Sequence, residues 1–183
     1  MFMKKTLLAA VIALGSVSVA QAGELGHGKV TFNGSIIDAP CSISAKSIDQ
    51  TVELGQISNV SLKGGGKTAP HHFSIELESC DLGTTSEDPE SKNKNKVVIT
   101  FSGAESSAQK GLLAISGTAK GASVAIAQGN GELIKLNTAT KEQVLQNGSN
   151  SLKFAAYVQG DGTAATITEG SFQASADFTL AYN

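Results

Sequence analysis

The amino-acid sequence predicts an all-β protein whose one domain is an antiparallel sandwich or barrel, and three observations carry this prediction. Residues 172–182 alternate between apolar and polar side chains, a period of two that places one face of a strand on a core. About eight to ten short segments of similar kind, separated by turn residues, fill the rest of the chain. No helical domain and no repeat of fixed period is evident. A sandwich with an immunoglobulin-like arrangement fits this pattern and this chain length.

The first 22 residues have the three parts of a secretory signal peptide. Lys4 and Lys5 form the basic end, an apolar run covers residues 7–19, and small residues precede the expected cleavage after Ala22. A membrane anchor is the alternative, but the run is shorter than the ~20 residues that a spanning helix needs. We therefore expect residues 1–22 to be removed and the mature chain to be exported, with no membrane span.

The mature chain begins with a glycine-rich leader, residues 23–28, and continues into an alternating segment, residues 29–36. The alternation predicts a strand. A glycine on the inward face of a strand weakens it and often marks the close approach of another backbone or side chain. The inward positions of this strand are Val30, Phe32, Gly34 and Ile36.

The chain contains two cysteines, Cys41 and Cys80. In an exported chain two cysteines most simply pair, and closing a loop of about 40 residues would stabilise the fold by roughly 4 kcal/mol. A zinc site is disfavoured, because the cysteines lack CxxC spacing and no histidine lies near either of them. We expect a disulfide and no metal site.

The middle of the chain predicts a succession of short strands and polar loops. Strands are expected at residues 41–43, 51–54, 72–80, 97–101, 112–116, 123–128, 132–136 and 152–158. Gly129 and Gly131 predict that two of these, 123–128 and 132–136, form a hairpin. Loops are expected at residues 61–70, 81–96 and 160–170, and residues 138–146 have the only helical pattern.

The final segment predicts one long strand. At ~3.3 Å per residue, residues 172–182 would span about 36 Å, roughly twice the usual strand length. A strand at a sheet edge with an exposed apolar face aggregates unless something covers it. One solution is that another chain supplies the neighbouring strand. The apolar positions of this strand are Phe172, Ala174, Ala176, Phe178, Leu180 and Tyr182.

Charge and motifs disfavour nucleic-acid binding and catalysis. The net charge is −2, and all 14 basic residues are lysines, so the side chain best suited to bidentate phosphate contacts is absent. Gly66-Lys67-Thr68 superficially resembles a phosphate-binding loop, but Ser61 stands where that motif needs glycine. No catalytic motif accompanies the histidines. We expect no cofactor and no enzymatic activity, and a small secreted enzyme is the weakest alternative.

Both ends of the mature chain closely resemble pilins of the chaperone–usher class, most of all the major rod pilins of P-type (pyelonephritis-associated) fimbriae. The resemblance rests on residues 28–44, on the spacing of Cys41 and Cys80, and on residues 169–183 with their penultimate Tyr182. It covers the whole mature chain. It implies the pilin fold, an incomplete immunoglobulin-like sandwich that a donor strand from another chain completes.

The resemblance divides the mature chain into an N-terminal extension, residues 23–38, and a pilin domain, residues 39–183. It implies that the extension is the donor strand and that Val30, Phe32, Gly34 and Ile36 are the donor positions. It also implies that a periplasmic chaperone recognises the groove before the extension of the next subunit fills it. The groove and chaperone-recognition residues implied by the resemblance are Gly170, Phe172, Ala174, Ala176, Phe178, Leu180 and Tyr182.

The implied function is that of a structural major subunit of a bacterial surface fimbria, which polymerises by donor-strand exchange and supports cell adhesion. The implied partners are a periplasmic chaperone, an outer-membrane usher, and identical and related pilin subunits. The implied location is the cell surface, reached through the periplasm. The alternative is a minor, adaptor or tip-adhesin subunit; an adhesin usually carries an extra lectin domain, for which the mature chain has no room.

Overall fold

The computed structural model describes residues 28–83 and 95–183. The described residues from Ile37 onward form one compact unit, and residues 28–36 belong to a separate one. The predicted signal peptide and most of the loop predicted at residues 81–96 lie outside the described residues. Within the described ranges, no helix has both the length and the apolar character needed to cross a membrane.

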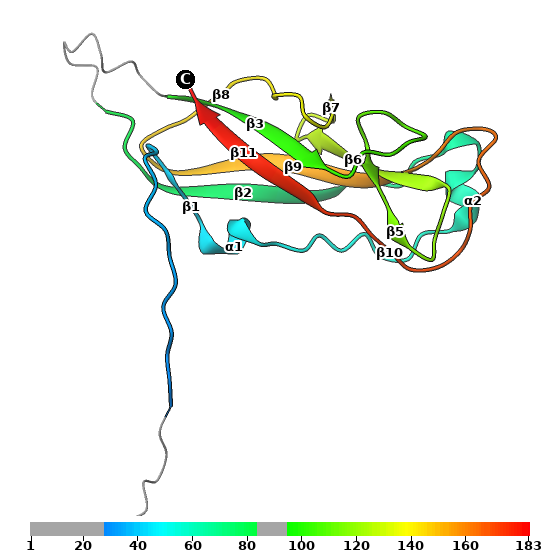
Figure 1. Cartoon of the computed structure of the whole chain (residues 1–183). Helices are drawn as coiled ribbons and strands as arrows, with labels where there is room; N and C mark the ends of the chain where they lie inside the picture. Colours follow the sequence, from blue (N-terminus) through cyan, green and yellow to red (C-terminus); the bar gives the residue numbers. More distant parts are fainter. Residues whose placement is uncertain (1–27, 84–94) are drawn as a thin grey trace, which may run out of the picture. The chain divides into compact units, whose positions relative to one another are not determined.

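The compact unit is built from short strands, as the alternation predicts. The described strands are β1 Ser42–Ile43, β2 His71–Cys80, β3 Lys96–Gly103, β4 Leu113–Ala114, β5 Ser116–Gly117, β6 Ala122–Gln128, β7 Leu133–Ile134, β8 Gln143–Val144, β9 Gly148–Gly160, β10 Phe172–Gln173 and β11 Ala176–Tyr182. The larger sheet has the order β1-β2-β9-β6-β4, with β7 paired to β6. The smaller sheet has the order β11-β3-β8, and β10 pairs with β5 (Figure 1). All described pairings between these strands are antiparallel, so the all-β prediction is confirmed.

The core lies between the two sheets. Phe101 of β3 meets Phe154 of β9 nearly edge to face, with ring centroids 5.2 Å apart. Alternate residues of the long strands are completely buried, among them Ile75 and Leu77 of β2. The predicted hairpin at residues 123–136 is confirmed, because β6 and β7 pair through Ile126 and Ile134. An immunoglobulin-like sandwich of the predicted kind results.

The helical segments are short: α1 covers Ala45–Ile48, α2 covers Asn59–Leu62, and the 3-10 turn η1 covers Lys63–Gly65. The helix expected at residues 138–146 is wrong, because hydrogen bonds hold this segment extended against β3. The Thr140 amide donates to the Ile99 carbonyl (2.9 Å), and the Ile99 amide donates to Thr140 Oγ1 (3.0 Å). Tertiary pairing outweighs a weak local helical preference here.

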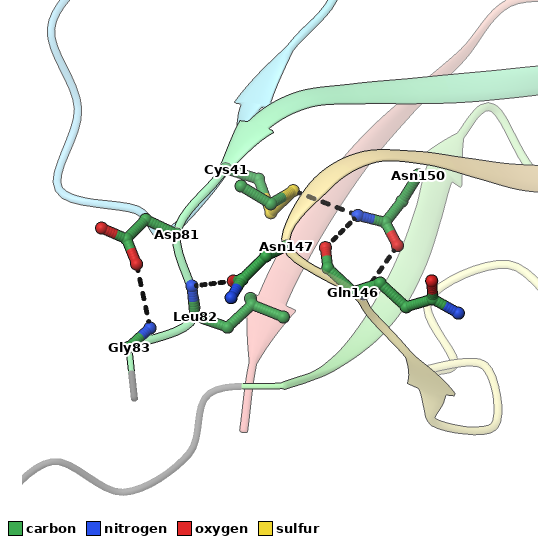
Figure 2. Close-up of a disulfide and its surroundings, with 8 residues drawn as sticks. Cys41, Asp81, Leu82, Gly83, Gln146, Asn147 and Asn150 are labelled. Carbon is green, nitrogen blue, oxygen red and sulfur yellow. Dashed lines mark hydrogen bonds between the residues drawn. A yellow bond between two sulfur atoms is a disulfide. The ribbon is translucent and has the colours of Figure 1, made fainter. Parts of the chain in front are cut away.

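The predicted disulfide between Cys41 and Cys80 is present (Figure 2). It ties the residue before β1 to the last residue of β2. Asn150 of β9 donates a hydrogen bond from Nδ2 to Cys80 Sγ (3.3 Å), and Asn147 Oδ1 accepts one from the Leu82 amide (2.8 Å). The start of β9 and the end of β2 are therefore held together around the disulfide.

The single long strand expected at residues 172–182 is divided into β10 and β11. The two pieces pair with different strands: Phe172 lies opposite Gly117 of β5, and Ala176 lies opposite Gly103 of β3. The chain therefore changes partner at residues 174–175. A β-carbon on Gly103 would lie 2.7 Å from the Ser175 carbonyl oxygen, so glycine is what permits the close approach at this change of partner.

Candidate functional site

Strand β11 is an edge of the smaller sheet. On one side it pairs with β3 from Ala176 opposite Gly103 to Tyr182 opposite Val97. On its other side no strand that the structure describes is paired with it. Main-chain amide and carbonyl groups on that side require another partner, either water or an added strand.

A second run of unpaired main chain, residues 49–57, follows α1. In the described part of the chain, this run contains no strand and makes no main-chain hydrogen bond to another main-chain group. The strand expected at residues 51–54 is therefore wrong, and the physical reason is that no neighbouring strand is there to pair with it. The start of the run is fixed by Ser47, whose Oγ accepts a hydrogen bond from the Glu76 amide (2.9 Å).

A groove of about 1150 Å³ is lined by both of these unpaired segments. Residues 47–57 contribute one side and residues 170–178 contribute the other. Its apolar floor comes from both sheets, through core residues that include Ile75, Phe101, Val124, Ile126 and Val158. Unpaired main chain on both sides and an apolar floor are what an inserted strand requires, because its main chain pairs outward while alternate side chains enter the core.

Most of the predicted groove residues line this groove. Leu180 and Tyr182 do not, although both lie on the face of β11 that packs against the core. The opposite side at residues 47–57 and the floor were not predicted as parts of the site. The alternation around Val52 and Leu54 was a signal for that side, since it marks an extended segment with an inward face. The predicted residues that line the groove are Gly170, Phe172, Ala174, Ala176 and Phe178.

Gly170 occupies a position that only glycine fits without rearrangement. Its φ is +151°, and an added β-carbon would lie 2.7 Å from the Ala119 nitrogen and closer still to Thr118 Oγ1. The main chain next to Gly170 is held against residue 118 by a hydrogen bond from the Thr118 amide to the Ser171 carbonyl (3.0 Å). Gly170 therefore allows the main chain to pass close to residues 118–119 at the start of the segment that lines the groove, residues 170–178.

Substituting Gly170→Ala is expected to lower the free energy of unfolding by more than about 1 kcal/mol, because the new methyl group meets both an unfavourable φ and fixed main chain. Urea unfolding of the mature chain measures this loss. Gly162→Ala is the matched control, since its φ is +116° but an added β-carbon has no neighbour within 4 Å. An equal loss in the two variants would contradict the steric explanation.

Tyr182 carries a buried hydroxyl that has no hydrogen-bond partner among the described residues. Burial raises the pKa of Tyr182 above its ordinary value, because desolvation disfavours the phenolate. The ring belongs to the inward face of β11, where it packs against the core. An unsatisfied hydroxyl of this kind costs stability.

Substituting Tyr182→Phe is expected to keep or raise the free energy of unfolding at neutral pH by up to about 1 kcal/mol, because it removes the unsatisfied hydroxyl. In the wild-type chain the stability linked to Tyr182 is complete below the unfolded pKa of about 10 and is lost as pH rises through the higher folded pKa. Denaturation measured from neutral to alkaline pH should show a smaller decline in the variant. A variant that is less stable at neutral pH, or an unchanged alkaline decline, would contradict this prediction.

Residues 28–36 form no strand with the rest of their own chain, so the strand expected at residues 29–36 has no partner among the described residues. Its apolar side chains are open to solvent: Val30 is 76% exposed, Phe32 89% and Ile36 103%. A β-carbon added to Gly34 would have no neighbour within 4 Å. The segment therefore has the alternation of a strand but no partner strand. Leaving its three large apolar side chains in water is unfavourable.

Comparison with known proteins gives consistent matches over the whole length. A family model described as "Fimbrial protein" matches residues 30–183. The chain is 55% identical to the Fimbria A protein of Serratia marcescens, over 100% of this chain and 99% of that protein. It is 45% identical to the Major MR/P fimbria protein of Proteus mirabilis, over 98% of this chain and 99% of that one.

Solved structures show the same similarity in three dimensions. A chain from a chaperone–usher pilus, solved for the molecular basis of rod uncoiling, superposes with a TM-score of 0.75 at 34% identity, covering 87% of this chain and 97% of the other. The P pilus rod subunit PapA superposes with a TM-score of 0.69 at 33% identity, covering 79% of this chain and 100% of PapA.

Proposed function

The chain belongs to the fimbrial protein family, the structural subunits of chaperone–usher pili, and on that premise we propose that it is the major rod subunit of a bacterial surface fimbria. The observation that carries the proposal is a groove with unpaired main chain on both sides, in a chain that also has an unpaired, alternating extension. The groove lacks a strand between its two sides, and the extension is an alternating segment that lacks partner strands. Copies of one chain can therefore join end to end, with the extension of one subunit completing the sandwich of the next.

The donor positions of the extension are Val30, Phe32, Gly34 and Ile36, which share one face of the alternation. Burying a Val, Phe or Ile side chain contributes about 1.5–3 kcal/mol each relative to exposure, and main-chain pairing along both sides adds to this. Release of a subunit requires withdrawal of the whole strand. The joint is therefore expected to persist for kinetic reasons.

Two further partners are implied by the family, a periplasmic chaperone and an outer-membrane usher. An apolar groove of this kind cannot remain empty in the periplasm without aggregation, so a periplasmic chaperone fills it first and recognises the strand side from Gly170 to Tyr182. An outer-membrane usher then exchanges the chaperone for the next extension. In this scheme residues 1–22 direct export, residues 23–38 act as the extension, residues 39–183 form the accepting domain, and the role is mechanical and not enzymatic.

The finer proposal is a rod of the P-type kind, supported by the similarity to the P pilus rod subunit PapA. The Major MR/P fimbria protein of Proteus mirabilis supports the role of a major subunit. In this role the subunit supports cell adhesion by carrying a binding tip away from the surface. A minor, adaptor or tip-adhesin subunit is the alternative.

Negative-stain microscopy of cells with and without the gene tests the proposal. Loss of the whole rod, restored when the gene is returned, is expected for a major subunit. Rods that persist while binding to host cells is lost would instead identify a tip adhesin, and rods that persist with unchanged binding would overturn the structural role.

A further inference from the structure

Three Asn-Gly pairs occur in the chain, at Asn33-Gly34, Asn130-Gly131 and Asn147-Gly148. In this dipeptide the glycine nitrogen can attack the side-chain amide carbon of the asparagine, because glycine carries no side chain to obstruct the approach and its main chain is the least restricted. Whether the attack occurs depends on whether the nitrogen and the amide are free to meet. The structure holds the three pairs in different ways.

The pair at residues 130–131 forms the turn between β6 and β7, and hydrogen bonds engage both reacting groups. The Gly131 amide donates to the Gln128 carbonyl (2.8 Å), and Asn130 Oδ1 accepts from the Glu132 amide (3.0 Å). Attack by Gly131 on Asn130 requires both bonds to break first. This pair is protected by the hairpin.

The pair at residues 147–148 is held beside the disulfide (Figure 2). Asn147 Oδ1 accepts a hydrogen bond from the Leu82 amide (2.8 Å), which restrains the side-chain amide of Asn147. Gly148 is the first residue of β9 and lies opposite the disulfide-bonded Cys80. This pair reacts only when the start of β9 opens.

The pair at residues 33–34 has neither protection. Asn33 and Gly34 are exposed, belong to no strand, and make no hydrogen bond to any described residue. No strand pairing and no main-chain hydrogen bond to a described residue restrains this pair, so its main chain can rotate into the reactive arrangement. The Gly34 nitrogen therefore has access to the Asn33 amide carbon.

We propose that Asn33 is a deamidation site of the unassembled subunit and that insertion of the extension into a neighbouring groove protects it. The Gly34 nitrogen forms a bond to Asn33 Cγ, and Nδ2 leaves as ammonia with the proton from the Gly34 amide. Water then opens the five-membered imide at either carbonyl, which gives aspartate or isoaspartate. No oxidant, metal or cofactor takes part.

The isoaspartate product changes the register of the extension. Its main chain runs through the former side-chain carbon, so one extra backbone atom separates Phe32 from Gly34. Because strand side chains alternate faces with a strict period of two, positions on either side of residue 33 can no longer share one face in regular register. Deamidation at Asn33 does not depend on the proposed function. The effect of isoaspartate on assembly does rest on the proposed function.

Peptide mapping by mass spectrometry tests the site in unassembled mature chain, kept from aggregating by its bound chaperone, and in assembled fibres, both incubated at neutral pH. In the unassembled chain Asn33 is expected to convert at least about tenfold faster than Asn130 and Asn147, which corresponds to about 1.4 kcal/mol of local opening. In fibres the conversion of Asn33 should fall toward that of the two protected pairs. Similar rates at all three pairs in the unassembled chain would overturn the site, whatever the outcome of assembly.

A second measurement separates the site from its effect. Unassembled wild-type chain that has been aged should add to fibres more slowly than fresh chain, whereas an Asn33→Gln variant aged in parallel should retain its rate. Equal loss in the two chains would overturn the effect on assembly. Equal conversion of Asn33 in fibres and in unassembled chain would overturn the protection and would count against insertion of the extension, while leaving the faster reaction at Asn33 intact.

Discussion

A chain that lacks residues 23–38 is expected to fold with its periplasmic chaperone and to form no fibres. The deletion removes the proposed donor strand, whereas both sides of the groove, residues 47–57 and 170–178, remain. Such a chain can accept an extension but cannot provide one. Size-exclusion chromatography and negative-stain microscopy of the released chain measure the result.

The truncated chain also provides a direct binding assay. A synthetic peptide with the sequence of residues 28–38 is expected to occupy the empty groove and raise the thermal midpoint of the truncated chain, because it restores the missing pairing and apolar contacts. A peptide of the same composition in scrambled order is the control. Fibres that form from the truncated chain alone would refute the donor-strand role of the extension.

Substituting Gly34→Leu is expected to block or strongly slow subunit addition. Gly34 lies on the same face of the alternation as Phe32 and Ile36, so a side chain at this position would point into the groove. Glycine places no side chain there, whereas leucine would introduce one where the groove has to accommodate none. Assembly kinetics with purified chaperone-bound subunits measure the effect.

Ser35→Leu is the matched control for Gly34→Leu. It adds the same side chain at the next residue, whose side chain in a strand points to the opposite face and away from the floor. Ser35→Leu should therefore assemble nearly as fast as the wild-type chain. Normal kinetics in Gly34→Leu, or equal slowing in the two variants, would count against the assigned face.

The strands of the core could be predicted from the sequence because their alternation reports burial directly. In β2, Ile75 and Leu77 are apolar and completely buried, while Glu76 between them and Ser74 and Glu78 on either side are polar. This pattern is local, so it is readable without any knowledge of neighbours. The disulfide was predictable for a similar reason, since the chain offers its two cysteines one simple pairing.

The division of the last strand could not be read from alternation. The pattern continues through Ala174 and Ser175, but the partner strand changes there from β5 to β3. Which strand pairs with which depends on contacts between distant residues, and side-chain period carries no information on it. The helix expected at residues 138–146 failed likewise, because β3 is the partner that keeps that segment extended.

One side of the candidate site was predicted and the other was not. The side from Gly170 to Phe178 has a strong alternating signal and a family resemblance. On the other side, residues 49–57 are defined by main-chain groups that lack main-chain partners, and side-chain alternation does not report whether a partner strand is present. The floor likewise combines residues from both sheets, such as Ile75 and Phe101, which only the fold brings together.

The disulfide determines how a fibre of joined subunits would carry tension. The first strand after the extension, β1, pairs with β2 at only two positions, Ser42 opposite Glu78 and Ile43 opposite Leu77. A pull on the extension would peel so short a strand away if it were the only connection. Cys41 lies before β1 and is bonded to Cys80, so the load passes covalently to the end of β2.

Strand β2 is well suited to receive that load, since it pairs with β9 from His71 opposite Ala156 to Cys80 opposite Gly148. Asn150 reinforces the same place through its contact with Cys80 Sγ. Each subunit would therefore transmit traction into the centre of its larger sheet while β1 bears none of it. In a reduced subunit the same traction would act on β1 and begin to unravel the domain from its N-terminal end.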